Sequence, residues 1–267
     1  MPDDYPQLVR QVLELADKLP IDPAAFAVLS KPKRNRLITE LETIIVRLNK
    51  AAAALEDVRE PQHVFDPTAP KVIGQLIASH LLLQSREKLT TVADRPFYGA
   101  GVYALYYTGD FDCYAPVSNK EHPIYVGKAD PEDLHAATPK VQGQKLFTRL
   151  KDHRRSLSNT NLQLGDFECR YLVVRSAWVK SAEDHLIHLF KPVWNKEMKV
   201  CFGFGKHGDS PGTRKNARSP WDTLHSGRAW ATTVDNTPNA RTVTQIKAAI
   251  AEHYKKNPPV TATPQGG

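Results

Sequence analysis

Cysteine is scarce in this chain, and long apolar runs are missing. The 267 residues contain three cysteines, Cys113, Cys169 and Cys201, an odd number without a paired spacing, which is typical of a reducing compartment. The densest apolar stretch, residues 72–83, is interrupted by polar side chains and is shorter than the about 20 apolar residues that span a bilayer. No apolar signal segment follows the acidic start of the chain. We therefore expect a cytoplasmic protein with no membrane partner.

The sequence also lacks the motifs of several common enzyme classes. It has no glycine-rich phosphate loop, no dinucleotide fingerprint and no Gly-x-Ser-x-Gly turn around a nucleophile. The cysteines are too scattered for a zinc site, and Cys201 with His207 is a weak pair. His185 and His188 share a predicted helix but have no obvious third ligand. These absences argue against nucleotide-dependent, serine-hydrolase and zinc chemistry.

Positive charge is concentrated in the second half of the chain. The formal net charge is +7, yet residues 1–98 carry 13 basic and 13 acidic side chains. Residues 140–218 carry 16 basic against 7 acidic side chains, a local excess of +9. Such a concentration indicates a polyanionic partner. A basic surface can equally be solvated without a partner, so charge alone leaves nucleic-acid binding open.

Hydrophobic periodicity predicts an N-terminal helical arm followed by a region of strands and helices, which indicates the α/β (α+β) class. In the first part of the chain the pattern predicts helices over residues 8–15, 37–55 and 70–88. Beyond residue 99 it predicts strands over 101–107, 123–127 and 166–174, and helices over 138–156, 178–190 and 242–254. We expect three regions: a helical arm at 1–90, an α/β domain at 95–230 with a basic loop at 203–230, and a C-terminal helix with a loose tail at 231–267.

A few polar residues near the ends of predicted elements are candidates for chemistry. Arg149 and His153 are four residues apart and share one helix face. Glu183 is expected in the first turn of a mostly apolar helix, where the helix dipole favours a carboxylate. Taken singly, each has an ordinary explanation as a solvated or helix-capping side chain. Tyr103 and Tyr125 would likewise pass for core aromatics.

Their order along the chain resembles a known nuclease pattern. Gly101-Val102-Tyr103 and Tyr125-Val126-Gly127 lie on two predicted strands, and this pair resembles the paired motif of the GIY-YIG nuclease superfamily. In that superfamily an Arg lies on the following helix, a metal-binding Glu on a later helix, and an Asn further along. Arg149, Glu183 and Asn195 match those places. The two tripeptides alone are a weak signal, whereas the ordered set is specific.

Further segments are similar to one restriction-enzyme group of that superfamily, the Type II endonucleases that cut CCGCGG. They are Tyr106–Asp110, Tyr125–Asp130 and Gly203–Asp209, with His153 four residues after Arg149 and Asn195 12 residues after Glu183. The resemblance covers residues from about 95 to 230 and leaves the first 60 without a counterpart. It implies an α/β (α+β) fold with a small mixed β-sheet flanked by helices. It also implies a sequence-specific hydrolase of phosphodiesters in double-stranded DNA.

The resemblance and the chemistry together suggest a role for each candidate. Glu183 would hold one Mg²⁺ per active site, because hard oxygen ligands suit that ion. Arg149 would bind a phosphate through its planar guanidinium. Tyr103 is the candidate base, and His153 would accept its proton, because a free phenol has a pKa of about 10.

Three further residues would assist this chemistry. Tyr125 would donate a hydrogen bond to a phosphate oxygen, Lys128 would favour the Tyr103 phenolate electrostatically, and Asn195 would orient Tyr or Glu.

We expect DNA contacts from two groups of residues: Lys206, His207, Arg214, Lys215, Arg218 and Arg228 in the basic loop, and Lys151, Arg154 and Arg155 on the helix after the second strand. The helix group is assigned to the DNA backbone, whereas the loop group could read guanine edges or bind phosphates without specificity.

A palindromic site that is cut in both strands implies two active sites related by a two-fold axis, and hence a homodimer. The resemblance also implies a DNA methyltransferase that protects the same site in the same prokaryotic cell.

Three alternatives stay open: a structure-selective GIY-YIG nuclease of repair or recombination, a non-catalytic DNA-binding protein with this domain, and a partner-binding protein built around the arm. The basic loop and the His four residues after the Arg favour the restriction enzyme.

Overall fold

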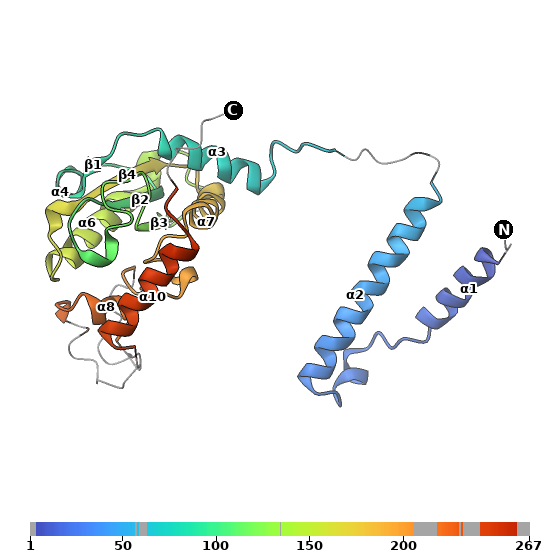
Figure 1. Cartoon of the computed structure of the whole chain (residues 1–267). Helices are drawn as coiled ribbons and strands as arrows, with labels where there is room; N and C mark the ends of the chain where they lie inside the picture. The colour runs from blue at the N-terminus through green and yellow to red at the C-terminus, as the bar shows by residue number, and fades with distance from the viewer. Residues whose placement is uncertain are drawn as a thin grey trace. The chain divides into compact units, whose positions relative to one another are not determined.

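The chain forms two compact units, Met1–Phe65 and Asp66–Gly267 (Figure 1). The computed structural model describes residues 4–56, 58, 63–133, 135–205, 218–229, 231 and 241–260, with the backbone alone at residue 176. Within these ranges no helix has both the length and the apolar character needed to cross a membrane.

The first unit consists of helices. They are α1 (Tyr5–Ala16), the 3-10 turn η1 (Pro23–Phe26) and α2 (Lys31–Ala54). A proline follows the N-cap Ser30 closely, where its fixed φ favours helix initiation. Neither α1 nor α2 contains a buried residue, although both carry an apolar face. The two helices expected over residues 8–15 and 37–55 are therefore present, with their apolar side chains exposed.

The second unit contains the sheet. Its strands are β1 (Glu87–Lys88), β2 (Gly101–Tyr107), β3 (Tyr125–Ala129) and β4 (Phe167–Val173). Its helices are α3 (Pro70–Leu82), α4 (Leu89–Val92), α5 (Pro139–Gln142), α6 (Lys145–Ser158), α7 (Val179–Phe190), α8 (Pro220–Leu224) and α10 (Val243–Lys256). Short 3-10 turns lie at Asp112–Tyr114, Leu164–Asp166, Ser176–Trp178 and Lys196–Met198.

The strands run in the order β1-β4-β2-β3, and all three described pairings are antiparallel. The expected α/β class is confirmed, but the sheet is antiparallel and not mixed. All seven residues of the central strand β2 are buried, because helices cover both faces of the sheet (Figure 1). Successive side chains point to opposite faces, so alternate residues of β2 enter two different hydrophobic clusters. Tyr103, Leu105 and Tyr107 face α6, and Val102, Ala104 and Tyr106 face α3 and α7.

Helix α3 belongs to the second unit, which moves the expected domain boundary from residue 90 to residues 65 and 66. Ala78, Leu81 and Leu82 of α3 pack in the cluster that also contains α7. Gly74 allows the two helices to approach closely, since a Cβ at this position would lie 2.6 Å from the backbone oxygen of Ser181. Apolar burial against α7 therefore makes α3 part of the sheet domain and not of the arm.

Three other expectations from the sequence are corrected by local structure. The helix expected over 138–156 is divided at Gly143, whose φ of +74° ends α5 before α6 begins. The segment expected as one long loop contains the short helix α8, capped at its start by the Ser219 hydroxyl. Helix α10 was expected outside the central domain, yet Ile246, Ile250 and Tyr254 lie in the same core as β2 and α6.

Substitution of Gly74 by alanine should destabilise the second unit. The new methyl group would collide with the rigid backbone of α7, and overpacking of this kind typically costs about 1–3 kcal/mol, against a helix-propensity gain of up to about 1 kcal/mol. We expect a lower Tm in thermal unfolding. Gly165→Ala is the matched control, because its added Cβ would meet nothing within 4 Å. Equal Tm values for the two variants would contradict the close α3–α7 contact.

Candidate active site

The two sequence motifs meet through the register of β2 and β3. Tyr103 lies directly opposite Gly127 in this antiparallel pair. The Tyr103 hydroxyl occupies the space into which a side chain at residue 127 would project, so even a Cβ there would overlap it. The glycine of the second motif therefore provides the room for the tyrosine of the first. Both tyrosines of the motifs face the same side of the sheet, with their ring centroids 6.2 Å apart.

Helix α6 brings two polar groups to the Tyr103 hydroxyl. His153 Nε2 lies 2.6 Å from that hydroxyl, and both residues are fully buried. The Arg149 Nε donates a longer hydrogen bond of 3.3 Å to the same oxygen. The apolar residues Leu146, Leu150 and Leu157 bury one face of α6, and this packing directs Arg149 and His153 towards β2. The expected i, i+4 pair of Arg149 and His153 is present, and both side chains contact the Tyr103 hydroxyl.

The environment of Tyr103 opposes loss of its proton. Burial raises the pKa of Tyr103 well above its usual value, and the neighbouring Tyr125 raises it further, whereas Arg149 lowers it. The pKa of Tyr125 is raised as well, mainly by burial and in part by the Glu183 carboxylate, with Arg149 acting in the opposite direction. Both phenols therefore carry their protons at neutral pH.

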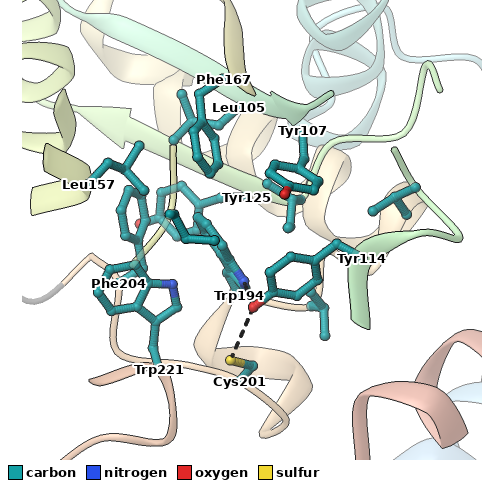
Figure 2. Close-up of a cluster of buried hydrophobic side chains, with 14 of the residues drawn as sticks. Leu105, Tyr107, Tyr114, Tyr125, Leu157, Phe167, Trp194, Cys201, Phe204 and Trp221 are labelled. Atoms are coloured by element: carbon teal, nitrogen blue, oxygen red, sulfur yellow. Dashed lines mark hydrogen bonds between the residues drawn. The ribbon is translucent and has the colours of Figure 1, made fainter. Parts of the chain in front are cut away.

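Residues 203–205 pack against the side chains that reach the Tyr103 hydroxyl. The Phe204 ring stacks on the His153 ring with centroids 4.5 Å apart and planes at 18°. It also meets the Tyr125 ring edge-on at 5.1 Å, and Figure 2 shows Phe204 beside Tyr125 and Trp221. The Gly205 carbonyl accepts a 3.0 Å hydrogen bond from Arg149. Phe204 and Gly205 were missed as site residues, although the segment Gly203–Asp209 was part of the family resemblance.

Glu183 lies beside a pocket of about 270 Å³ at the β3 edge of the sheet. The pocket is lined by Tyr125, Glu183, Trp194, Asn195, Lys196, Glu197, Phe202, Gly203 and Gly205. Burial raises the pKa of Glu183 to about 7, with Lys128 lowering it and the carboxylates of Asp184 and Glu197 raising it further. Glu183 lies in the second turn of α7, one turn later than the sequence suggested.

This arrangement fits a single divalent cation at Glu183. A half-buried carboxylate that faces a pocket, with a second carboxylate at Glu197 nearby, favours a bound positive charge. The described residues contain no group of three or more His, Cys, Asp or Glu side chains that could hold a metal ion. Glu183 and Glu197 are carboxylates at this pocket that a cation could contact.

Asn195 binds the backbone of the edge strand β3. Its Oδ1 accepts from the Val126 N–H at 2.9 Å, and its Nδ2 donates to the Val126 carbonyl at 2.8 Å. The side chain thus replaces a neighbouring strand and fixes β3 next to Tyr125. Lys128 points to the other face of the sheet from Tyr103, forms an ion pair with Asp130 and acts electrostatically on Glu183. Its expected role beside the Tyr103 phenolate has no support in this geometry.

The basic residues expected to contact DNA have different environments. Lys206, His207, Arg214 and Lys215 lie outside the described residues. Arg228 is 3% exposed and forms a 2.7 Å ion pair with Asp222, so it is a buried structural residue and not a DNA contact. Arg218 is half-buried and donates to the Ala231 carbonyl.

On α6, Lys151 and Arg155 are exposed. Arg155 forms an i, i+3 ion pair with Asp152, and Arg154 pairs with Asp94. Exposed cations of this kind are available for phosphate contacts. Contact between these α6 residues and the DNA backbone stays a prediction.

A buried polar network lies behind the pocket and was not foreseen from the sequence. The Tyr114 hydroxyl accepts a 2.9 Å hydrogen bond from Trp194 Nε1 and lies 2.6 Å from His225 Nε2. Figure 2 shows Tyr114 between Trp194 and Cys201. Burial lowers the pKa of His225 to about 3, so this histidine is neutral at physiological pH. The network fixes Trp194, the residue before Asn195.

Replacement of Asn195 by aspartate should disturb β3 while keeping the side-chain shape. The new carboxylate would lose the donor to the Val126 carbonyl and bury a charge, which costs about 1–3 kcal/mol. We expect a lower Tm and a loss of catalytic activity larger than the loss of folded protein. Asn35→Asp on the exposed surface of α2 is the control. An Asn195→Asp protein with wild-type stability and activity would contradict the clamp on β3.

Comparison with known protein families gives a match that covers this site. The family model described as the Eco29kI GIY-YIG domain, which represents a restriction endonuclease family, matches residues 95–254. This range is more than half of the chain, and it includes Tyr103, Tyr125, Arg149, Glu183 and Asn195. It also extends past residue 230 and into α10. Among curated proteins none matches the chain. On this match, together with the site geometry, the chain belongs to the Eco29kI family of GIY-YIG Type II restriction endonucleases.

Proposed function

We propose that this restriction endonuclease cuts double-stranded DNA at CCGCGG, as a homodimer, with one Mg²⁺ in each active site and Tyr103 as the proton relay. The observation that carries the proposed chemistry is the buried contact of 2.6 Å between the Tyr103 hydroxyl and His153 Nε2. The proposed recognition sequence rests on the family resemblance. The enzyme would act in the cytoplasm of a prokaryotic cell, where a methyltransferase protects the same sites.

Tyr103 can act as a base only if His153 accepts the phenolic proton. Because its pKa is raised by burial, the phenol keeps its proton until a neighbour accepts it. Arg149 donates to the Tyr103 oxygen, which leaves that hydroxyl free to donate its own proton to His153 Nε2. A proton from the attacking water can then pass to the Tyr103 oxygen as the phenolic proton moves to His153.

Arg149 and Tyr125 are suited to hold the phosphate. The guanidinium has five N–H donors, and its bonds to Tyr103 and to the Gly205 carbonyl leave others for phosphate oxygens. Such charge-assisted bonds stabilise the charge that develops on the phosphate in the transition state. The Tyr125 hydroxyl lies beside Gly205 and at the pocket, where it can donate to another phosphate oxygen.

Glu183 would hold the Mg²⁺ ion at the pocket. When bound there, the ion would stabilise the negative charge on the scissile phosphate and on the leaving 3′-oxygen. Lys128 would hold Glu183 in its ionised form, since it lowers the pKa of that carboxyl. Asn195 would keep β3, and with it Tyr125, in place beside this site.

Recognition of CCGCGG would come from the basic loop. We propose that Lys206, His207, Arg214, Lys215 and Arg218 contact the DNA, some of them at guanine O6 and N7. Lys151, Arg154 and Arg155 would contact the backbone from α6. The local excess of positive charge over residues 140–218 supports a polyanionic substrate.

The proposed specificity can be tested with two short DNA duplexes. One carries CCGCGG and the other differs from it by a single base pair within the site, and each is incubated with the full-length protein and Mg²⁺ or EDTA. We expect cleavage of both strands of the first duplex with Mg²⁺ only. Cleavage of branched DNA with both duplexes intact would instead favour the structure-selective nuclease. Tight binding without cleavage of any DNA would favour the non-catalytic alternative.

Replacement of Tyr103 by phenylalanine should abolish cleavage but keep DNA binding. The variant removes only the hydroxyl that contacts His153, and positioned acid–base groups typically contribute about 10²–10⁴-fold to rate. Tyr106→Phe is the control, because that tyrosine is on the same strand but on the other face of the sheet. The measurements are a single-turnover cleavage rate and a Kd for the cognate duplex. Cleavage by Tyr103→Phe near the wild-type rate would remove Tyr103 from the mechanism.

Glu183→Gln should also bind DNA without cutting it, because the amide keeps the size of the side chain but is a much weaker ligand for Mg²⁺. Cleavage rates measured over a range of Mg²⁺ concentrations check this role. Glu197→Gln is the comparison variant, since Glu197 lines the same pocket from the surface. Full rescue of Glu183→Gln by excess Mg²⁺ would show that Glu183 is not the sole protein ligand.

We propose that the arm contributes to the homodimer through α1 and α2. Together these helices line an apolar groove of about 620 Å³. On α2, Leu37, Leu41, Ile44 and Leu48 recur three and four residues apart and are 39–51% exposed. This spacing is typical of a helix that packs against another helix. A second copy is the occupant that matches, because a two-site cut needs two protomers.

The charges of α2 favour antiparallel packing of the two copies. Basic side chains gather at its start, at Lys31, Lys33, Arg34 and Arg36, and acidic ones follow at Glu40 and Glu42. Parallel packing would bring the two basic ends together, whereas antiparallel packing keeps them apart and brings the acidic pair closer to Arg47 and Lys50 of the other copy. The arm would thus join two nuclease domains in the symmetric arrangement that a palindrome needs.

A pair of charges on the apolar face of α2 should separate the protomers. We expect the wild-type chain to be a dimer and the double variant Leu41→Glu with Leu48→Glu to be monomeric at the same concentration, because each glutamate would be buried in the interface. The control places two glutamates on the opposite side of α2, at Thr39 and Val46. Sedimentation of the full-length proteins gives the mass. A monomeric wild type, or a dimer in the double variant, would contradict this use of the arm.

A further inference from the structure

We propose that the buried ion pair of Arg228 and Asp222 is a positioning device for catalysis, which holds residues 203–205 against His153 and Arg149. Arg228 thus has a role other than the DNA contact that the sequence suggested. The inference concerns the geometry of the site, and its catalytic consequence rests on the proposed role of Tyr103 and His153.

The ion pair is enclosed and fully hydrogen-bonded at its acidic end. Arg228 is 3% exposed and Asp222 is 1% exposed. Arg228 Nε donates to Asp222 Oδ1 at 2.7 Å, and the Ser219 hydroxyl donates to the other oxygen, Oδ2, at 2.5 Å. The guanidinium also lies over the Trp221 ring, 4.5 Å from its centre. Asp222 and Trp221 belong to α8, so this short helix fixes the direction of the guanidinium.

The other donors of Arg228 fix the backbone before the basic segment. Its NH1 donates to the Phe204 carbonyl at 3.2 Å, and its NH2 donates to the Gly203 carbonyl at 3.0 Å. Gly203 has a φ of +121°, and a Cβ there would overlap the Ser219 side chain. One planar group therefore sets the position of two successive carbonyls, which a single-point donor such as lysine cannot reproduce.

This backbone in turn contacts the catalytic groups. Phe204 stacks on the His153 ring at 4.5 Å, and the Gly205 carbonyl accepts from Arg149 at 3.0 Å. His153 and Arg149 are the two side chains that reach the Tyr103 hydroxyl. The chain of contacts therefore runs from Asp222 through Arg228 and residues 203–205 to the proposed proton relay. Residues 206–217 connect Gly205 to Arg218 in the sequence. The two residues that flank this segment therefore both adjoin the contacts made by the ion pair.

A gain in folding stability does not by itself explain why the chain buries this ion pair. Burial of two charges carries a desolvation cost that often equals the gain from their attraction, and well-packed apolar side chains can replace buried ion pairs without loss of stability. An apolar replacement would not, however, specify where the Gly203 and Phe204 carbonyls lie. Because displacement of a catalytic group by about 1 Å can cost about 10²-fold in rate, the directional bonds of Arg228 matter more for the site than for the core.

The test compares Arg228→Lys with Arg170→Lys in the full-length protein. Arg170 is the control, because it is also a buried arginine that forms an ion pair, with the half-buried Glu121 at 2.6 Å, and lies over a ring, that of Tyr106. It lies on the opposite face of the sheet from Tyr103. For each variant we would measure the Tm, the Kd for cognate DNA, and the single-turnover cleavage rate against pH. We expect Arg228→Lys to lose about 10²-fold in rate and to change its pH profile, with Kd unchanged. Arg170→Lys should change only the Tm.

A second measurement reads the geometry without any cleavage. Ring stacking by Phe204 shifts the proton resonances of the His153 ring, and we expect this shift to change in Arg228→Lys but not in Arg170→Lys. Phe204→Leu, which removes the stacking and keeps the Arg228 contacts, should reproduce the change. Wild-type cleavage by Arg228→Lys, or unchanged His153 resonances in that variant, would overturn the inference. A wild-type protein that cuts no DNA would overturn the proposed function instead, and the His153 resonances would still decide the positioning role.

Discussion

The Tyr103 hydroxyl lies over Gly127 of the neighbouring strand β3, on the face of the sheet that α6 covers, and the rest of the site depends on that placement. A buried phenol without partners would be costly, so the fold must supply polar groups at this one position. Helix α6 does so with His153 and Arg149, whose spacing of four residues places both on the same face. The apolar packing of α6 against the sheet is therefore also what positions the groups proposed for proton transfer.

The site combines residues from both faces of the sheet because β3 is an edge strand. Tyr125 projects towards α6, whereas Glu183 comes from α7 on the other face and reaches the same pocket. An edge strand has unpaired backbone groups, and Asn195 satisfies those of Val126 in the way a further strand would. The edge thereby stays open for a substrate at the pocket while its backbone remains fixed. This arrangement agrees with the family to which residues 95–254 belong.

The sequence was sufficient for the elements whose patterns are local. Strand β2 begins and ends where its β-forming run does, and α7 ends before Pro192 as expected. The ordered motif residues led to the tyrosine, arginine, histidine and glutamate that meet in the structure. Long-range packing was not predictable in this way. The sequence position of Gly74 does not reveal that α3 packs on α7. Arg228 lies in a basic segment and was therefore expected to contact DNA, whereas in the structure it binds Asp222 and two backbone carbonyls.

Together these features describe a division of roles in a restriction endonuclease. The sheet and α6 hold the groups proposed for proton transfer, and α7 brings the proposed metal ligand. Helix α8 and Arg228 contact the segment that leads into the basic loop. We propose that this chemistry is directed to one DNA sequence. The most direct test is to digest unmethylated genomic DNA with the purified protein and Mg²⁺ and to sequence every fragment end. We predict that all ends carry the same cut within CCGCGG; ends scattered over unrelated sequences, or none at all, would contradict the account.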